Sequence, residues 1–80
     1  MREDEAGLVD AIVAALADHV KAHPHAADSA DGVARWWLGS ELAGATPKQI
    51  ECALELMVAR DELRHLRLMD GRLLYARAER

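Results

Sequence analysis

The chain has 80 residues and a formal net charge of −4, and Cys52 is its only cysteine. A chain of this length forms one small domain, which we place at residues 1–80 with an ordered core over about 6–77. One cysteine excludes an intramolecular disulfide, so we expect a reducing, cytoplasmic location. Residues 1–20 contain no long apolar run, so neither a signal peptide nor a membrane span is expected.

Charge is distributed unevenly along the chain. Residues 1–31 carry two basic and seven acidic side chains, whereas residues 60–80 carry six basic and four acidic ones. Broad binding to nucleic acid depends on clustered lysine and arginine, so the acidic first part disfavours it. The alanine-rich, lysine-poor composition is typical of bacterial proteins.

Apolar residues near the N-terminus recur every three or four positions, which predicts an amphipathic helix from about Glu5 to Ala22. Pro24 ends this segment, because the residue before a proline avoids helical angles. The side chains expected on the buried side of this helix are Leu8, Val9, Ile12, Val13, Leu16 and Val20.

A second, shorter helix is predicted from Ala30 to Leu38, with Asp28 or Ser29 as its N-cap. One short extra strand between the first two helices would be able to pair with a C-terminal hairpin. Residues 40–45 form either a turn or an additional helical turn, and the sequence leaves these two alternatives open.

The third helix has a strong start signal. Thr46 and Gln49 form a capping box, and Pro47 occupies the favoured first helical position. We expect the helix to end near Asp61. Its buried stripe should be Ile50, Ala53, Leu54, Met57 and Val58, and its exposed positions should be Lys48, Gln49, Glu51, Cys52 and Glu55.

Leu63–Leu68 and Arg72–Ala76 are predicted to form a β-hairpin around a two-residue turn at Asp70-Gly71. In the register that this turn sets, Leu66 faces Tyr75 and Leu68 faces Leu73 on one side of the ribbon. The other, outward side would then consist of His65, Arg67, Arg72 and Leu74.

The order of three helices and a hairpin, with TPKQIECALELMVARDEL leading into RHLRLMDGRLLYAR, resembles the winged helix-turn-helix superfamily. The resemblance implies a small α+β domain whose third helix is the recognition helix and whose hairpin is the wing. One position departs from the family pattern, because Asp61-Glu62-Leu63 stands where the family usually has glycine and two apolar residues.

Adjacent helical residues point about 100° apart, so Trp36 and Trp37 cannot both enter one small core. Trp37 aligns with Val33 and is the expected core residue, and Trp36 is either a lid on that core or an exposed anchor for another chain. Our leading hypothesis is a non-catalytic module that binds protein, either itself or a larger system. Trp36, Arg67, Arg72 and Leu74 would form its surface.

The alternative is a small DNA-binding transcriptional regulator, as the resemblance implies. Lys48 and Gln49 would contact bases, and Arg67 and Arg72 would contact phosphates. Glu51 and Glu55 on the same helix face disfavour this alternative, because DNA carries a dense negative charge.

Residues that suggest other chemistry have simpler interpretations. His19 and His23 have the i, i+4 spacing of metal ligands, but we interpret them and His25 as solvated histidines near a helix C-terminus. Cys52 is not expected to be catalytic, and the sequence contains no nucleotide-binding or hydrolase motif. We therefore expect neither enzymatic activity, nor a cofactor, a metal or a small-molecule substrate.

Overall fold

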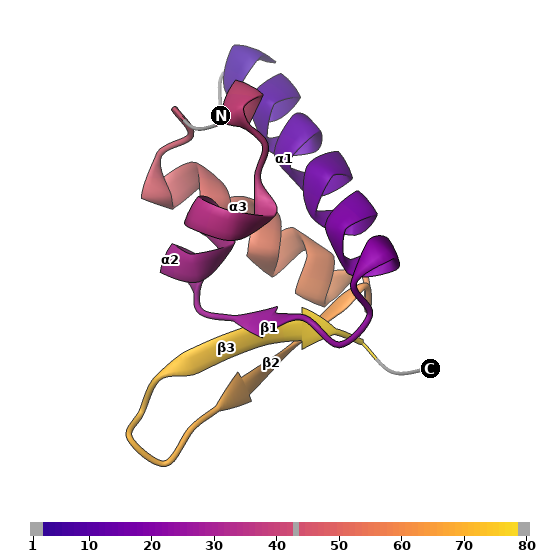
Figure 1. Cartoon of the computed structure of the whole chain (residues 1–80). Coiled ribbons are helices and arrows are strands. Elements are labelled where there is room, and N and C mark those ends of the chain that lie inside the picture. The colour runs from indigo at the N-terminus through magenta and orange to yellow at the C-terminus, as the bar shows by residue number, and fades with distance from the viewer. Residues whose placement is uncertain (1–2, 43, 79–80) are drawn as a thin grey trace.

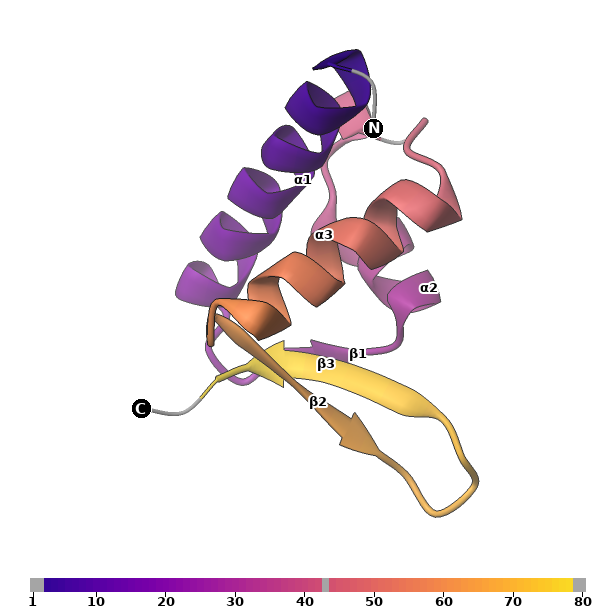
Figure 2. The same cartoon turned by 180° about the vertical axis from the view of Figure 1, so that it is seen from behind.

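The computed structural model describes residues 3–42 and 44–78. Its helices lie on one side of a three-stranded antiparallel sheet, from which a hairpin extends (Figures 1 and 2). The expected α+β fold, with three helices followed by a C-terminal hairpin, is confirmed. In chain order the elements are α1 (Glu3–Ala22), β1 (Ala27–Asp28), α2 (Ala30–Gly32), the π-helical turn η1 (Val33–Trp37), the 3₁₀ turn η2 (Ser40–Leu42), α3 (Pro47–Ala59), β2 (Leu63–Arg67) and β3 (Leu73–Arg77).

The core lies between α1, α3 and the near side of the sheet. The spacing of apolar residues in α1 correctly predicted its buried side, and these side chains pack against the buried stripe of α3. Leu63 and Tyr75 close the core from the sheet. The fully buried side chains of largest volume are Ile12, Leu16, Val33, Leu54, Met57 and Leu63.

The second helical segment has the predicted start but a different helical type at its end. The Ser29 hydroxyl accepts a hydrogen bond from the Gly32 N–H, so Ser29 is the N-cap of α2. The chain then widens into the π-helical turn η1 and leaves it at Leu38, which is extended. The two tryptophans separate as expected, with Trp37 6% exposed and Trp36 74% exposed.

The extra strand between the first two helices is present. It is β1, which pairs with β3 through Ala27 opposite Ala76 and Asp28 opposite Tyr75. Of the two alternatives for residues 40–45, a helical turn forms over η2, and Ala43 lies outside the described residues.

Both ends of α3 have clear chemical causes. The Gln49 N–H donates to Thr46 Oγ1, and Gln49 Oε1 accepts from the Thr46 N–H, so the predicted capping box is confirmed. At the other end Asp61 has a φ of 59°, with its N–H donating to the Val58 carbonyl, and the Glu62 N–H donates to the Met57 carbonyl. These two bonds form a Schellman motif, in which Asp61 takes the left-handed position usually held by glycine.

The hairpin register differs by one residue from the predicted one. His65 pairs with Tyr75, Leu66 with Leu74, and Arg67 with Leu73. The predicted pairs, Leu66 with Tyr75 and Leu68 with Leu73, are therefore wrong. The physical reason is the loop, which contains three residues, Met69–Gly71, instead of two.

Two hydrogen bonds define this loop. The Gly71 N–H donates to the Leu68 carbonyl, and the Leu68 N–H donates to the Arg72 carbonyl. Gly71 has a φ of 90°, as expected for a turn followed by a residue in the left-handed region, the usual three-residue hairpin loop. Because side chains alternate along a strand, the slip of one residue moves every side chain of β2 to the opposite face.

Candidate interaction surfaces

The face of the sheet that points away from the helices carries a leucine cluster between arginines. Strand alternation places Arg64, Leu66 and Leu68 of the β2 side and Arg72, Leu74 and Ala76 of the β3 side on this face. We refer to these six residues as the outer sheet face. Leu66 is 36% exposed, while Leu68 and Leu74 are half-buried. Figures 1 and 2 show no helix on this side of the described sheet.

Two arginines of the outer sheet face contact other groups of the chain. Arg64 Nε donates to the Arg77 carbonyl at 3.3 Å. Arg72 Nε lies 2.7 Å from Asp70 Oδ2, and the Arg72 N–H donates to Asp70 Oδ1. This exposed pair offsets the charge of Arg72 beside the loop.

The opposite face of the hairpin combines aromatic, basic and acidic groups. The ring of His65 lies 6.5 Å from that of Tyr75, with 18° between the ring planes. Burial raises the pKa of Tyr75, and the negative charges of Glu55 and Glu51 on α3 raise it further. The exposed carboxylates of α3 therefore face this side of the hairpin, where Arg67 also lies opposite Leu73.

The four residues predicted as a protein-binding surface do not lie together. Arg72 and Leu74 are on the outer sheet face, whereas Arg67 is on the face of His65 and Tyr75. The prediction that Arg67 shares a side with Leu74 is wrong because of the register. Trp36 is exposed on the separate π-helical turn η1.

The residues predicted to contact DNA have mixed positions. Lys48 is exposed, but Gln49 is half-buried and its side-chain oxygen belongs to the capping box. Cys52 was expected at an exposed position, but it is half-buried and packs against the core. Arg67 and Arg72, the predicted phosphate contacts, lie on opposite faces of the hairpin.

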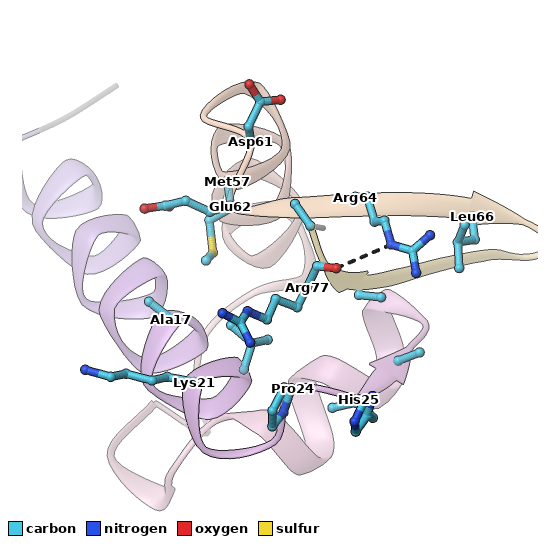
Figure 3. A pocket seen from close by; sticks show the side chains of 15 residues that line it. Ala17, Lys21, Pro24, His25, Met57, Asp61, Glu62, Arg64, Leu66 and Arg77 are labelled. Carbon is cyan, nitrogen blue, oxygen red and sulfur yellow. Dashed lines mark hydrogen bonds between the residues drawn. The ribbon is translucent and has the colours of Figure 1, made fainter. Parts of the chain in front are cut away.

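An open pocket of about 880 Å³ lies where α1, α3 and the sheet meet (Figure 3). Val20 and Met57 form part of its apolar lining. Basic groups come from Lys21, His25, Arg64 and Arg77, and the carboxylates of Asp61 and Glu62 also line it. The pocket therefore presents both charges around an apolar lining, and Arg64 and Leu66 connect it to the outer sheet face.

The histidines near the end of α1 form a small aromatic stack. The ring centroid of His19 lies 4.7 Å from that of His23 and 4.8 Å from that of Trp37. Burial lowers the pKa of His19, and the neighbouring His23 lowers it further. In residues 3–42 and 44–78, no group of three or more His, Cys, Asp or Glu side chains is arranged to hold a metal ion.

Arg64, Leu66 and Leu68 are the surface residues that the sequence analysis missed. The sequence shows that apolar residues alternate in 63–68. It does not show the length of the hairpin loop, which decides which of the alternating residues face outward. Asp70-Gly71 does not decide this length, because the pair is compatible with loops of two and of three residues. In the structure the Arg72 N–H donates to Asp70 Oδ1, a local turn bond that aspartate favours.

Neither a protein-family model nor a curated protein nor a solved structure matches this chain. Over residues 3–42 and 44–78, no helix combines the length and apolar character needed to cross a membrane.

Proposed function

We propose that this protein is a non-catalytic interaction module of the winged-helix type, which binds another polypeptide through its outer sheet face. The observation that carries the proposal is the pair Leu66 and Leu74. These leucines lie opposite each other on a face that no helix of the described chain covers. Apolar side chains gathered on an open face are typical of contact sites for protein.

The order of elements supports the winged-helix part of the proposal. A strand, β1, lies between the first two helices and pairs with the C-terminal hairpin, and α3 begins with a Thr-Pro cap. In this arrangement α3 would be the recognition helix and β2 with β3 would be the wing. The exposed side of α3 carries Glu51 and Glu55 with a single lysine, Lys48.

These charges are the reason to prefer a polypeptide to DNA as the partner. A duplex approaching α3 would meet two carboxylates, and repulsion of phosphate would oppose binding. Of the residues predicted to contact DNA, Lys48, Arg67 and Arg72 are exposed and cationic, and Arg72 is paired with Asp70. We keep Trp36 as a second, separate contact point for a protein partner, because exposed tryptophans are frequent binding anchors.

The test compares the full wild-type chain with the double variant Leu66→Glu/Leu74→Glu. Sedimentation velocity measures self-association, and capture by the immobilised chain, followed by titration with the purified captured protein, measures a foreign partner. We expect the double variant to weaken binding at least about tenfold, because two carboxylates would be forced into an apolar contact. Trp36→Ala, which leaves the outer sheet face intact, is the matched variant for the second contact point.

Each outcome bears on the proposal. A wild-type chain that stays monomeric and captures no protein overturns it, and so does a captured protein whose affinity is unchanged by the double variant. A gel shift with random duplex DNA at low salt tests the alternative. A salt-sensitive shift that Lys48→Ala and Arg67→Ala abolish would assign the protein to DNA binding instead.

A further inference from the structure

Strand β2 forms one edge of the sheet. The strand order is β1-β3-β2, so one side of β2 pairs with β3 and the other side pairs with no described strand. A strand edge exposes a row of backbone N–H and C=O groups, which can pair with another extended chain.

The hydrogen bonds at the two ends of the hairpin identify which groups point outward. The Leu68 N–H donates to the Arg72 carbonyl, and the Ala78 N–H donates to the Glu62 carbonyl. In an antiparallel ladder, hydrogen-bonded pairs alternate with non-bonded pairs. Even-numbered residues of β2 therefore bond to β3, and the N–H and C=O groups of Leu63, His65 and Arg67 point to the free side.

The side chains along this edge are basic. Arg64, His65 and Arg67 lie within the five residues of β2, and no carboxylate occurs from 63 to 69. If two copies of the chain paired through β2, four arginines would share one small ribbon, and like charges in neighbouring strands are destabilising. The charge pattern therefore disfavours a second copy as the added strand.

We propose that the free edge of β2 binds an extended acidic segment of a partner protein as a fourth strand of the sheet. The backbone groups of Leu63, His65 and Arg67 would form the ladder. Acidic side chains of the partner would lie beside Arg64 on the outer sheet face and beside Arg67 on the opposite face. An apolar side chain of the partner would lie beside Leu66.

This inference depends on the proposed function and specifies its chemistry. The pairing mode requires a polypeptide, because only a polypeptide supplies alternating N–H and C=O groups. The charge of the edge then selects an acidic segment over a neutral or basic one. Leu66, as a member of both the outer sheet face and β2, connects the two proposals.

The first test uses a seven-residue peptide in which two glutamates flank a pair of valines (Thr-Val-Glu-Val-Val-Glu-Val), so that one glutamate lies beside Arg64, the other beside Arg67 and a valine beside Leu66. The same peptide with lysine in place of both glutamates is its charge control. Amide hydrogen exchange, followed by NMR, is measured on the full chain with and without each peptide. We expect the glutamate peptide to slow exchange at Leu63, His65 and Arg67 and to leave Arg64 and Leu66 nearly unchanged. The lysine peptide should bind at least about tenfold more weakly, because its charges repel the arginines.

A pair of variants at one position tests the ladder directly. His65→Pro removes an outward N–H without removing a bond to β3, and proline is tolerated at such edge positions. It should weaken peptide binding about tenfold, whereas His65→Ala, which keeps the N–H, should change it less than about threefold. Thermal unfolding of both variants confirms that each remains folded.

The outcomes separate this inference from the proposed function. Slowed exchange at the three odd-numbered residues, lost in His65→Pro, supports the added strand. Peptide binding with no odd–even pattern, or equal binding of both peptides, overturns it. A natural partner that depends on Leu66 and Leu74 but binds His65→Pro normally would also overturn it while leaving the proposed function intact. Displacement of the glutamate peptide by duplex DNA would assign the arginines to phosphate and contradict both proposals.

Discussion

Leu66 lies directly opposite Leu74 across the hairpin, on the face of the sheet that points away from the helices. Leu63, three residues earlier on the same strand, is 2% exposed and belongs to the core. Two leucines of one short strand therefore have different roles, because an odd spacing along a strand reverses the direction of the side chain.

This difference predicts unequal costs of mutation. Leu63→Ala should lower the free energy of unfolding by about 2–5 kcal/mol, because it leaves a cavity in the core. Leu66→Ala should lower it by less than about 1 kcal/mol, as is usual for exposed positions. Urea unfolding followed by tryptophan fluorescence measures both values, and equal losses would contradict the observed register.

The left-handed residue after α3 gives a second prediction. Asp61→Gly and Asp61→Ala both remove the carboxylate, but only glycine adopts a φ of 59° without strain. The glycine variant should therefore be more stable than the alanine variant by about 1 kcal/mol. Both variants lack the carboxylate, so the difference between their free energies of unfolding reports only the cost of the left-handed backbone at position 61. Equal free energies of unfolding would exclude the Schellman motif at the end of α3.

Tyr75 is the only tyrosine, so its ionisation can be followed by absorbance. Burial and then Glu55 and Glu51 hold its pKa above the usual value of 10.0. Glu55→Gln should lower this pKa, because it removes the carboxylate that, of the two, more strongly opposes formation of the tyrosinate. Asp10→Asn, which changes an exposed residue of α1, is the control and should leave the pKa of Tyr75 unchanged.

His19 predicts a dependence of stability on pH. Its pKa is lowered from 6.5 by burial and by His23, so the unfolded chain binds a proton more readily than the folded chain does. Stability linked to this group is therefore complete above pH 6.5 and is lost as the pH falls through 6.5 toward the folded-state value. His19→Gln should make the free energy of unfolding less dependent on pH in this window. If the pH dependence is the same in this variant, other titrating groups cause it.

The helices were predictable because their signals are local. The Thr46–Gln49 capping box and the three-to-four spacing of α1 act within one or two turns, and both are confirmed. The placement of Trp37 inside and Trp36 outside follows from the same helical geometry. Residues 33–37 adopt a π-helical turn, which no local propensity in the sequence indicated.

The hairpin register was not predictable from its turn signal. Asp70-Gly71 is compatible with a two-residue loop and with a three-residue loop in which Gly71 takes the last position. A two-residue loop would put each side chain of β2 on the face opposite to the one it has in the structure. The leucine surface is therefore identified only by the structure. A single residue of loop length thus decided which side chains are available to a partner.

The arginines along β2 also affect how concentrated solutions of this protein behave. Their mutual repulsion between molecules is ionic, and dissolved salt shortens its range to about 3 Å at 1 M. In concentrated salt, two copies should therefore pair through their β2 strands into a closed dimer, whereas low salt should disfavour this pairing.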